Sequence, residues 1–245
     1  MMIFSAKTCV GRVRSNNEDA FYVPPKNGNY PELFMVADGM GGHRGGEVAS
    51  QMAVKEVSDY INARFSKDFN EDLIKAMIND SIMEANRKIL MAAMDHEEWA
   101  GMGTTLTMVL FLGKKIFIGH VGDSRAYMIR NNTITQLTRD HSLVWQLMEE
   151  GRLTLDETRT HPMKNIITRA LGTDRVLEPD FLEYDLEKND IIVLCSDGLT
   201  NMLEDDEIKN IVCGQELETA AEMLIHAANL HGGIDNITVE LIRAD

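Results

Sequence analysis

Several features that would indicate other protein classes are scarce in this sequence of 245 residues. Cysteine occurs three times, as Cys9, Cys195 and Cys213, and no two of these residues form a Cys-x-x-Cys motif. This number and spacing argue against a disulfide framework and against a structural zinc site. We interpret all three as reduced cysteines of a cytoplasmic protein, since no histidine motif supports a catalytic thiol.

Proline and long apolar runs are also rare. Only five prolines occur, and neither a Pro/Ser-rich linker nor a repeat of fixed period divides the chain, so we expect a single catalytic domain over residues 1–245. The longest apolar run, 106–112, is far shorter than the roughly 20 residues that span a bilayer. The N-terminus has no signal-peptide pattern. We therefore expect a cytoplasmic protein without a membrane segment.

Basic residues are the minority charge. Acidic residues outnumber them 39 to 24, which gives a formal net charge of -15. Such a surface repels phosphate backbones and anionic lipids, so we expect neither nucleic acid nor membrane as a partner. The hydrophobic fraction of 44% is enough for a substantial core.

Hydrophobic periodicity predicts a chain rich in short strands, with helices near both ends. The expected strands cover residues 3–10, 20–23, 33–37, 104–112, 116–120, 125–129, 133–137, 181–184, 191–195 and 237–242. The expected helices cover residues 46–65, 71–94, 142–150, 205–212 and 217–230. Turns at 113–115 and 130–132 are too short for parallel connections, which favours antiparallel sheets with helices layered on their faces.

Acidic residues recur where the predicted strands begin or end. They are Asp38 before Gly39, Asp197 before Gly198, Asp123 after Gly122, Asp235 before the last strand, and Asp19 beside Glu18. Each Asp-Gly pair alone is typical of an ordinary turn. Several acids at strand ends, however, would lie within a few ångströms of one another if those ends converge.

Converging carboxylates repel one another unless a cation lies between them. Carboxylates together with a backbone carbonyl, here that of Gly39, are hard oxygen donors that suit Mg²⁺ or Mn²⁺. A residue without a side chain also leaves its carbonyl free to turn toward an ion. The pattern therefore predicts a divalent-metal site rather than a zinc site.

A glycine-rich loop, 38–46, follows one of these strands and opens a helix. Its spacing is similar to a dinucleotide-binding G-x-G-x-x-x-G motif, but Arg44 occupies the position where the standard fingerprint needs glycine. Two consecutive helices follow, so no βαβ unit closes. We interpret the loop as a tight turn that passes close to a metal ion.

Eight segments, in this order along nearly the whole chain, resemble the metal-dependent protein serine/threonine phosphatases of type 2C, in their compact bacterial form. The segments are 14–20 (RSNNEDA), 37–43 (ADGMGGH), 103–105 (GTT), 119–125 (GHVGDSR), 137–142 (LTRDHS), 167–172 (ITRALG), 196–199 (SDGL) and 235–238 (DNIT). The resemblance implies an α+β fold, a four-layer α-β-β-α sandwich whose two central antiparallel sheets are flanked by helix pairs.

The resemblance also implies residue roles around two Mn²⁺ or Mg²⁺ ions and a third, weaker site. Asp38 would bridge the two ions, with the Gly39 carbonyl on one and Asp197 and Asp235 on the other. Asp123 would hold the third ion with Asp197, and Glu18 and Asp19 would act near the metals, partly through water. Arg14 would bind the substrate phosphate, and Arg14, Asp19 and Asp38 would be the catalytic residues.

The implied activity is hydrolysis of phosphoserine and phosphothreonine in proteins by a hydroxide that bridges the two ions. Animal relatives carry a proposed proton-donating histidine directly after the first Asp-Gly, where this chain has Met40. The general acid therefore stays open. A metal-bound water at the third site is the better candidate, and His43 is interpreted as a loop residue.

The expected partners are phosphorylated proteins, including a bacterial serine/threonine kinase that the enzyme would oppose, and we expect a monomer. Residues 148–170 match the variable flap of the family, which we expect to influence substrate choice. Two alternatives remain: a non-catalytic relative that binds phosphoproteins, and a regulatory phosphatase that acts on one switch protein such as a sigma-factor antagonist.

Overall fold

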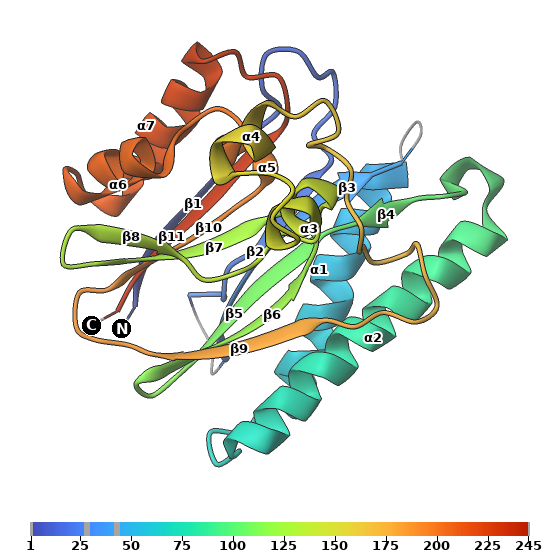
Figure 1. The fold of residues 1–245 in the computed structure, drawn as a ribbon. Coiled ribbons are helices and arrows are strands. Elements are labelled where there is room, and N and C mark those ends of the chain that lie inside the picture. The colour runs from blue at the N-terminus through green and yellow to red at the C-terminus, as the bar shows by residue number, and fades with distance from the viewer. Residues whose placement is uncertain (1, 27–29, 42–44, 245) are drawn as a thin grey trace.

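The computed structural model describes residues 2–26, 30–41 and 45–244. Two antiparallel sheets pack face to face, and a helix pair covers the outer face of each (Figure 1). The first, which we call the β11 sheet, contains β1 (Ile3–Cys9), β11 (Ile237–Arg243), β10 (Ile191–Cys195), β7 (Arg125–Arg130) and β8 (Thr133–Gln136), in that order. The predicted four-layer sandwich is confirmed.

The second, the β3 sheet, carries the longest strand. In spatial order it contains β2 (Asp19–Tyr22), β3 (Glu32–Met40), β5 (Leu106–Leu112), β6 (Lys115–Val121) and β9 (Asp180–Asp185), and the short β4 (Gly103–Thr104) pairs with β3. The hairpin between β5 and β6 turns at Gly113, whose φ of 61° is a conformation that glycine adopts readily. Asn131 and Asn132, both with positive φ, make the corresponding turn between β7 and β8.

Long helices cover the β3 sheet and shorter ones the β11 sheet. They are α1 (Gly45–Arg64) and α2 (Glu71–Asp95) on the β3 sheet, and α6 (Asp205–Cys213) and α7 (Leu217–Leu230) on the β11 sheet. Helix α2 starts where Asn70 accepts a hydrogen bond from the Leu73 amide, a standard N-cap. Its apolar stripe, which includes Ile74 and Ile89, is buried as the helical spacing predicts.

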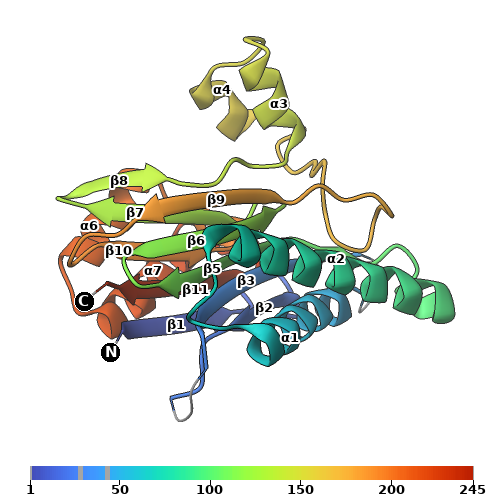
Figure 2. The ribbon, with the colours of Figure 1, turned by 90° about the horizontal axis from the view of Figure 1, so that it is seen from below.

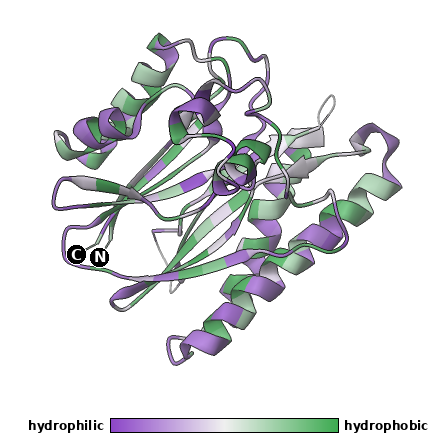
Figure 3. Ribbon diagram, in the orientation of Figure 1, coloured by the Kyte–Doolittle hydropathy of each residue, from purple (hydrophilic) through white to green (hydrophobic). Residues whose placement is uncertain are grey.

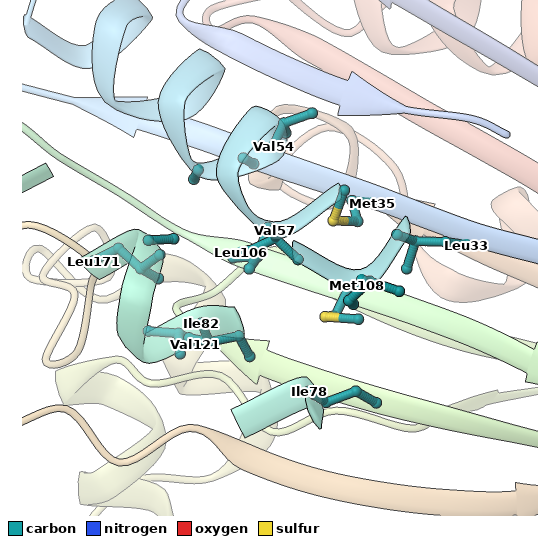
Figure 4. Close-up of a cluster of buried hydrophobic side chains, with 14 of the residues drawn as sticks. Leu33, Met35, Val54, Val57, Ile78, Ile82, Leu106, Met108, Val121 and Leu171 are labelled. Atoms are coloured by element: carbon teal, nitrogen blue, oxygen red, sulfur yellow. The ribbon is translucent and has the colours of Figure 1, made fainter. Parts of the chain in front are cut away.

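Three apolar clusters fill the three interfaces between the layers. Side chains of α1 and α2, such as Val57 and Ile82, meet Met35 and Met108 of the β3 sheet (Figure 4). A second cluster lies between the β11 sheet and helices α6 and α7, and a third between the two sheets. Colouring by hydropathy shows apolar central strands beneath helices of mixed character (Figure 3).

Residues along β3 alternate between two of these clusters. Leu33 and Met35 face the helices, whereas Phe34 and Val36 face the other sheet. A strand that is covered on both faces can therefore be apolar almost throughout. Apolar packing on both faces therefore fixes the position of the polar end of β3 relative to the core.

Sequence reasoning placed several boundaries incorrectly. It ended β3 at residue 37, but β3 continues to Met40 because Gly39 and Met40 pair with Thr104 and Gly103. The single strand expected at 104–112 is interrupted at Thr105 for the same reason. The short helices η1 (Glu97–Trp99) and α5 (Asp197–Thr200) were not predicted.

The flap, residues 148–170, begins in the last turn of α3 (Leu143–Glu149), and α3 and the flap helix project beyond the sheets (Figure 2). Flap residues Arg159 and Lys164 contact Glu204 and Asn201. No helix was predicted between residues 150 and 181, yet the flap contains α4 (Leu155–Thr160). Thr154 and Glu157 form a capping box at its start, a signal that the sequence carried and that we did not use. None of the helices in the described residues is long and apolar enough to cross a membrane.

Phe34 offers a test of the core between the sheets. Its side chain is fully buried and makes edge-to-face contacts with Phe4 and Phe111, at ring distances of 5.2 Å and 5.6 Å. Truncation to alanine should lower the free energy of unfolding by about 3–5 kcal/mol, measured by urea denaturation. Val176→Ala, at a position 82% exposed, should change it by less than about 0.5 kcal/mol. Similar values for the two variants would contradict this packing.

Candidate metal centre

Asp19 joins the two sheets by hydrogen bonds. It lies opposite Asp38 in the β2–β3 register, so both belong to the β3 sheet. One Asp19 carboxylate oxygen, Oδ2, accepts hydrogen bonds from the hydroxyls of Ser196 at 2.8 Å and Thr238 at 2.6 Å, both from the β11 sheet. These hydrogen bonds therefore keep the acidic residues of the two sheets close to one another.

The backbone of Asp38 is fixed by two threonines. Its N–H donates to Thr105 Oγ1 at 2.8 Å, and its carbonyl accepts from the Thr105 amide and from Thr104 Oγ1, both at 2.9 Å. Asp38 thus lies inside β3, in a strand that is paired on both sides. A side chain on so rigid a backbone is a well-placed ligand.

Both Asp-Gly pairs have glycine because two backbones meet there. A Cβ on Gly39 would overlap the carbonyl oxygen of Gly46, where α1 begins, and a Cβ on Gly198 would overlap the carbonyl of Asn236. Close approach of a helix or loop therefore excludes any side chain. The sequence argument gave a different reason for Gly39, a carbonyl freed to turn. The packing of α1 is the constraint that the structure shows.

Asp197 begins the short helix α5, directly after β10. It lies near the acids of the β3 sheet, since the charge of Asp197 raises the pKa of Asp38. Asn201 Nδ2 donates a hydrogen bond to Asp197 Oδ2 at 2.9 Å.

Asp235, Arg14 and Glu18 form the more exposed edge of this group. Arg14 Nη2 lies 2.9 Å from Asp235 Oδ2, in an ion pair whose side chains are 52% and 31% exposed. The pKa of Glu18 is raised by burial and lowered in turn by Arg14. Arg14 is thus paired here with an acid, whereas the resemblance assigned it to a substrate phosphate.

Asp123 follows the turn at the end of β6 and is buried. The charge of Asp197 acts on it, and its Oδ1 has no hydrogen-bond partner among the described residues. Asp19 Oδ1 is also buried without such a partner. Each of these two oxygens is therefore a hydrogen-bond acceptor without a donor, close to other carboxyl groups.

Burial and mutual repulsion disfavour the charged form of these acids. Burial first, then neighbouring carboxylates, raises the pKa of Asp38 and Asp123 well above the usual value and raises that of Asp197. Burial also raises the pKa of Asp19, to about 7, against the hydrogen bonds from Thr238 and Ser196. Within the described residues, no lysine or arginine side chain forms an ion pair with any of these four.

The donor set fits a hard divalent cation. Such an ion would bind the carboxylate oxygens that lack partners and would reduce the repulsion between neighbouring acids. Neither cysteine nor histidine contributes a ligand to this site. In the described ranges, no three acidic, histidine or cysteine side chains are arranged to hold one metal ion by themselves. Mg²⁺ and Mn²⁺ sites commonly use one or two carboxylates and complete their shell with water and carbonyls. A few shared aspartates are therefore enough.

A cavity of about 450 Å³ opens beside Asp123 and Asp197. Its walls include Trp145 of α3, and Arg159 and Lys164 of the flap. A larger hollow of about 650 Å³ runs along α2, and none of the acids above lines it. A substrate that reacts beside the acids would therefore occupy the smaller cavity and not the hollow along α2.

A family model described as protein phosphatase 2C matches residues 11–228. The chain belongs to the protein phosphatase 2C family. Membership confirms the predicted family and the enzyme class, a phosphoprotein phosphatase. The matched range includes Arg14, Asp19, Asp38, Asp123 and Asp197, and ends before Asp235.

Relatives of this phosphatase align over almost their full length. The serine/threonine phosphatase Stp of Listeria welshimeri is 41% identical over 96% of this chain and 93% of its own. The solved serine/threonine phosphatase of S. agalactiae covers 100% of both chains at 40% identity, with a TM-score of 0.91. The catalytic domain of PstP, solved in complex with two manganese ions, has a TM-score of 0.86 at 35% identity, covering 99% of this chain and 97% of its own.

Sequence reasoning about this phosphatase missed the residues that support the acids. Asn236 is one: it accepts from the Glu18 amide at 2.8 Å and donates to the carbonyls of Val10 and Asn16 at 2.9 Å and 2.8 Å, so it fastens the segment that carries Arg14. Thr105, Ser196, Asn201 and Thr238 are the others. All except Asn201 fall within the quoted segments, so their position beside an acid was an available signal. His43 lies outside the described residues.

Stability of the metal-free enzyme should fall as pH rises. The folded-state pKa of Asp19, about 7, exceeds its ordinary value of 3.8, so its contribution is fully present below about pH 4 and lost as pH rises through 7. With EDTA present, the melting temperature should therefore decrease between about pH 5 and pH 8.

Asp19→Asn keeps an oxygen acceptor for Ser196 and Thr238 and should flatten this decrease. Asp206→Asn, whose side chain is 82% exposed, should leave it unchanged. A melting temperature that rises equally with pH in the wild type and in Asp19→Asn would show that the buried acids do not repel one another.

Proposed function

We propose that this chain hydrolyses phosphoserine and phosphothreonine in proteins with Mn²⁺ or Mg²⁺, two ions per site and a third beside them. The observation that carries the proposal is the convergence of acids from both sheets: Asp19, opposite Asp38 in the β3 sheet, accepts a hydrogen bond from Ser196, the neighbour of Asp197. No lysine or arginine among the described residues forms an ion pair with any of these three acids. Family membership and the activity named for the relatives support the same reaction.

We assign the ions to the acids gathered between the sheets. Asp38 would be shared by two ions, with the Gly39 carbonyl on one and Asp197 and Asp235 on the other; Asp123 would serve the third together with Asp197. Glu18 would act at the edge. When bound, the cations supply a water molecule of lowered pKa and positive charge beside the phosphate.

The other work falls to side chains of the protein. Asp19, held by Ser196 and Thr238, keeps its second oxygen directed at the acids and can retain a proton near neutral pH. Arg14 presents a planar pair of donors that matches two phosphate oxygens, and it would leave Asp235 to bind them. No serine or cysteine is required as a nucleophile.

The oligomeric state, the location and the substrates of the enzyme are also proposals. We propose a monomeric cytoplasmic enzyme with one catalytic domain over residues 1–245, whose substrates include a serine/threonine kinase that it opposes. The flap, residues 148–170, would influence substrate choice because Arg159 and Lys164 line the cavity beside Asp123 and Asp197.

Removal of Asp38 or Asp197 tests the assignment directly. Each alanine variant should remain folded and lose activity toward a phosphopeptide by more than about a hundredfold, since losing even an outer-shell partner of a metal costs 10–100-fold. The exposed Asp206→Ala variant is the matched control and should keep wild-type activity. Substantial turnover by both variants in excess Mn²⁺ would end the assignment.

Hydrolysis of p-nitrophenyl phosphate distinguishes the enzyme from a non-catalytic relative. The wild type should hydrolyse it in Mn²⁺ and stop on addition of EDTA. A folded wild-type protein that binds phosphopeptides without turnover would favour the binding role.

Arg14→Ala should act mainly on substrate binding. Loss of a charge-assisted hydrogen bond to phosphate should raise KM by about tenfold and change kcat less. Arg14→Lys keeps the charge without the paired donors and should fall between alanine and wild type. An unchanged KM together with a higher Mn²⁺ requirement would mean that Arg14 serves Asp235 and not the phosphate.

A further inference from the structure

Gly122, the residue before Asp123, sits in a backbone conformation that strongly favours glycine. Its φ is +109°, and a Cβ there would overlap the side chain of Thr105. The conformation of this turn sets the direction in which the chain continues after β6, and so the orientation of Asp123. Whatever holds Gly122 therefore determines where the Asp123 carboxylate lies.

His141 holds both polar backbone groups of Gly122. The His141 amide donates to the Gly122 carbonyl at 2.7 Å, and the Gly122 amide donates to His141 Nδ1 at 3.1 Å. Both contacts are buried, so neither group has water as an alternative partner. The pair of bonds fixes the turn more firmly than one bond would.

The other ring nitrogen of His141 is oriented by an acid. Because Nδ1 accepts a hydrogen bond, the proton lies on Nε2, which is 3.3 Å from Asp180 Oδ2 and can donate to it. Arg169 Nη1 also lies 3.3 Å from Nε2, but both nitrogens then carry protons, so Asp180 is the acceptor that they share. Asp180 is itself paired with Arg169 Nη1 at 3.1 Å, through its Oδ1. Burial also lowers the pKa of His141, which favours the neutral ring that this geometry needs.

His141 also fastens the base of the flap. Its carbonyl accepts from the Thr168 amide at 2.7 Å, near the end of the flap. On the other side, His120 Nε2 donates to the Arg139 carbonyl at 2.9 Å. The segment 139–141 is thus anchored to β6 at two points, and the turn before Asp123 is held from a rigid support.

We propose that His141 is a positioning residue that, through Gly122, sets the Asp123 carboxylate for a divalent cation. The inference rests on the proposed function, because it requires Asp123 to be a metal ligand. His141 contacts neither the ion nor the substrate in this role. It works as the second layer that orients a ligand, a kind of contact whose loss commonly weakens metal sites by about 10–100-fold.

Two amide variants separate the nitrogens of the ring. Asparagine at 141 keeps an acceptor near the position of Nδ1 for the Gly122 amide, whereas glutamine reaches toward Asp180 and leaves that amide unpaired. Manganese binding is measured without turnover, from the electron paramagnetic resonance signal of free Mn²⁺ during titration. Asp123→Asn identifies the class of ion that depends on Asp123.

His141→Gln should weaken the Asp123-dependent class by about tenfold or more, and His141→Asn should stay within about threefold of wild type. In the Asp123→Asn background, His141→Gln should have no further effect on Mn²⁺ binding. Equal losses in the two amide variants would overturn the inference, and so would a loss that persists without Asp123.

Asp180→Ala provides a variant outside the turn, should His141→Gln fail to fold. It removes the acceptor that orients the ring and should weaken the same class by about threefold. No change in Asp180→Ala, together with a loss in His141→Asn, would contradict the inference. If Asp123→Asn itself leaves the titration unchanged, the assignment of Asp123 as a ligand is wrong, and the inference falls with it.

Discussion

Carboxyl groups from two different sheets share one partly buried space, and their mutual repulsion is the constraint on which this structure depends. Asp19 and Asp38 come from the β3 sheet, and Asp197 follows β10 of the other sheet. Separate burial of each acid would be unfavourable. The hydroxyls that bond to Asp19 offset part of that cost, and a divalent cation would offset more.

The surrounding fold serves to keep the acids together. Apolar clusters between the layers set the sheet spacing. Gly39 lets α1 approach β3, and Gly198 lets the 235–236 loop approach α5. Asn236, Thr105 and His141 fix the backbones around the acids through side-chain hydrogen bonds. Each of these contacts joins segments that are distant in the sequence. The centre is therefore a product of the tertiary structure and not of one local motif.

Much of this arrangement could be predicted because it follows local rules. The apolar stripe of α2 and the short turns at 113–115 and 130–132 predicted the layered antiparallel fold. Acidic residues directly after apolar runs predicted the candidate metal ligands. Two features could not be found that way. Strand β3 extends to Met40 only because β4 pairs with it, and α1 approaches Gly39 so closely that no side chain fits there. Both are contacts between distant segments, which periodicity does not contain.

Proton release on metal binding tests the central claim most directly. Mn²⁺ is titrated calorimetrically near pH 6 in buffers of different ionisation enthalpy, so that the protons released per ion can be counted. Since burial and neighbouring carboxylates raise the pKa of Asp38 well above its usual value, and burial raises that of Asp19 to about 7, binding should release protons to the buffer. Binding with no release at this pH would contradict the account, because the acids would then be ionised already, and burial and mutual repulsion would be too weak to raise their pKa values.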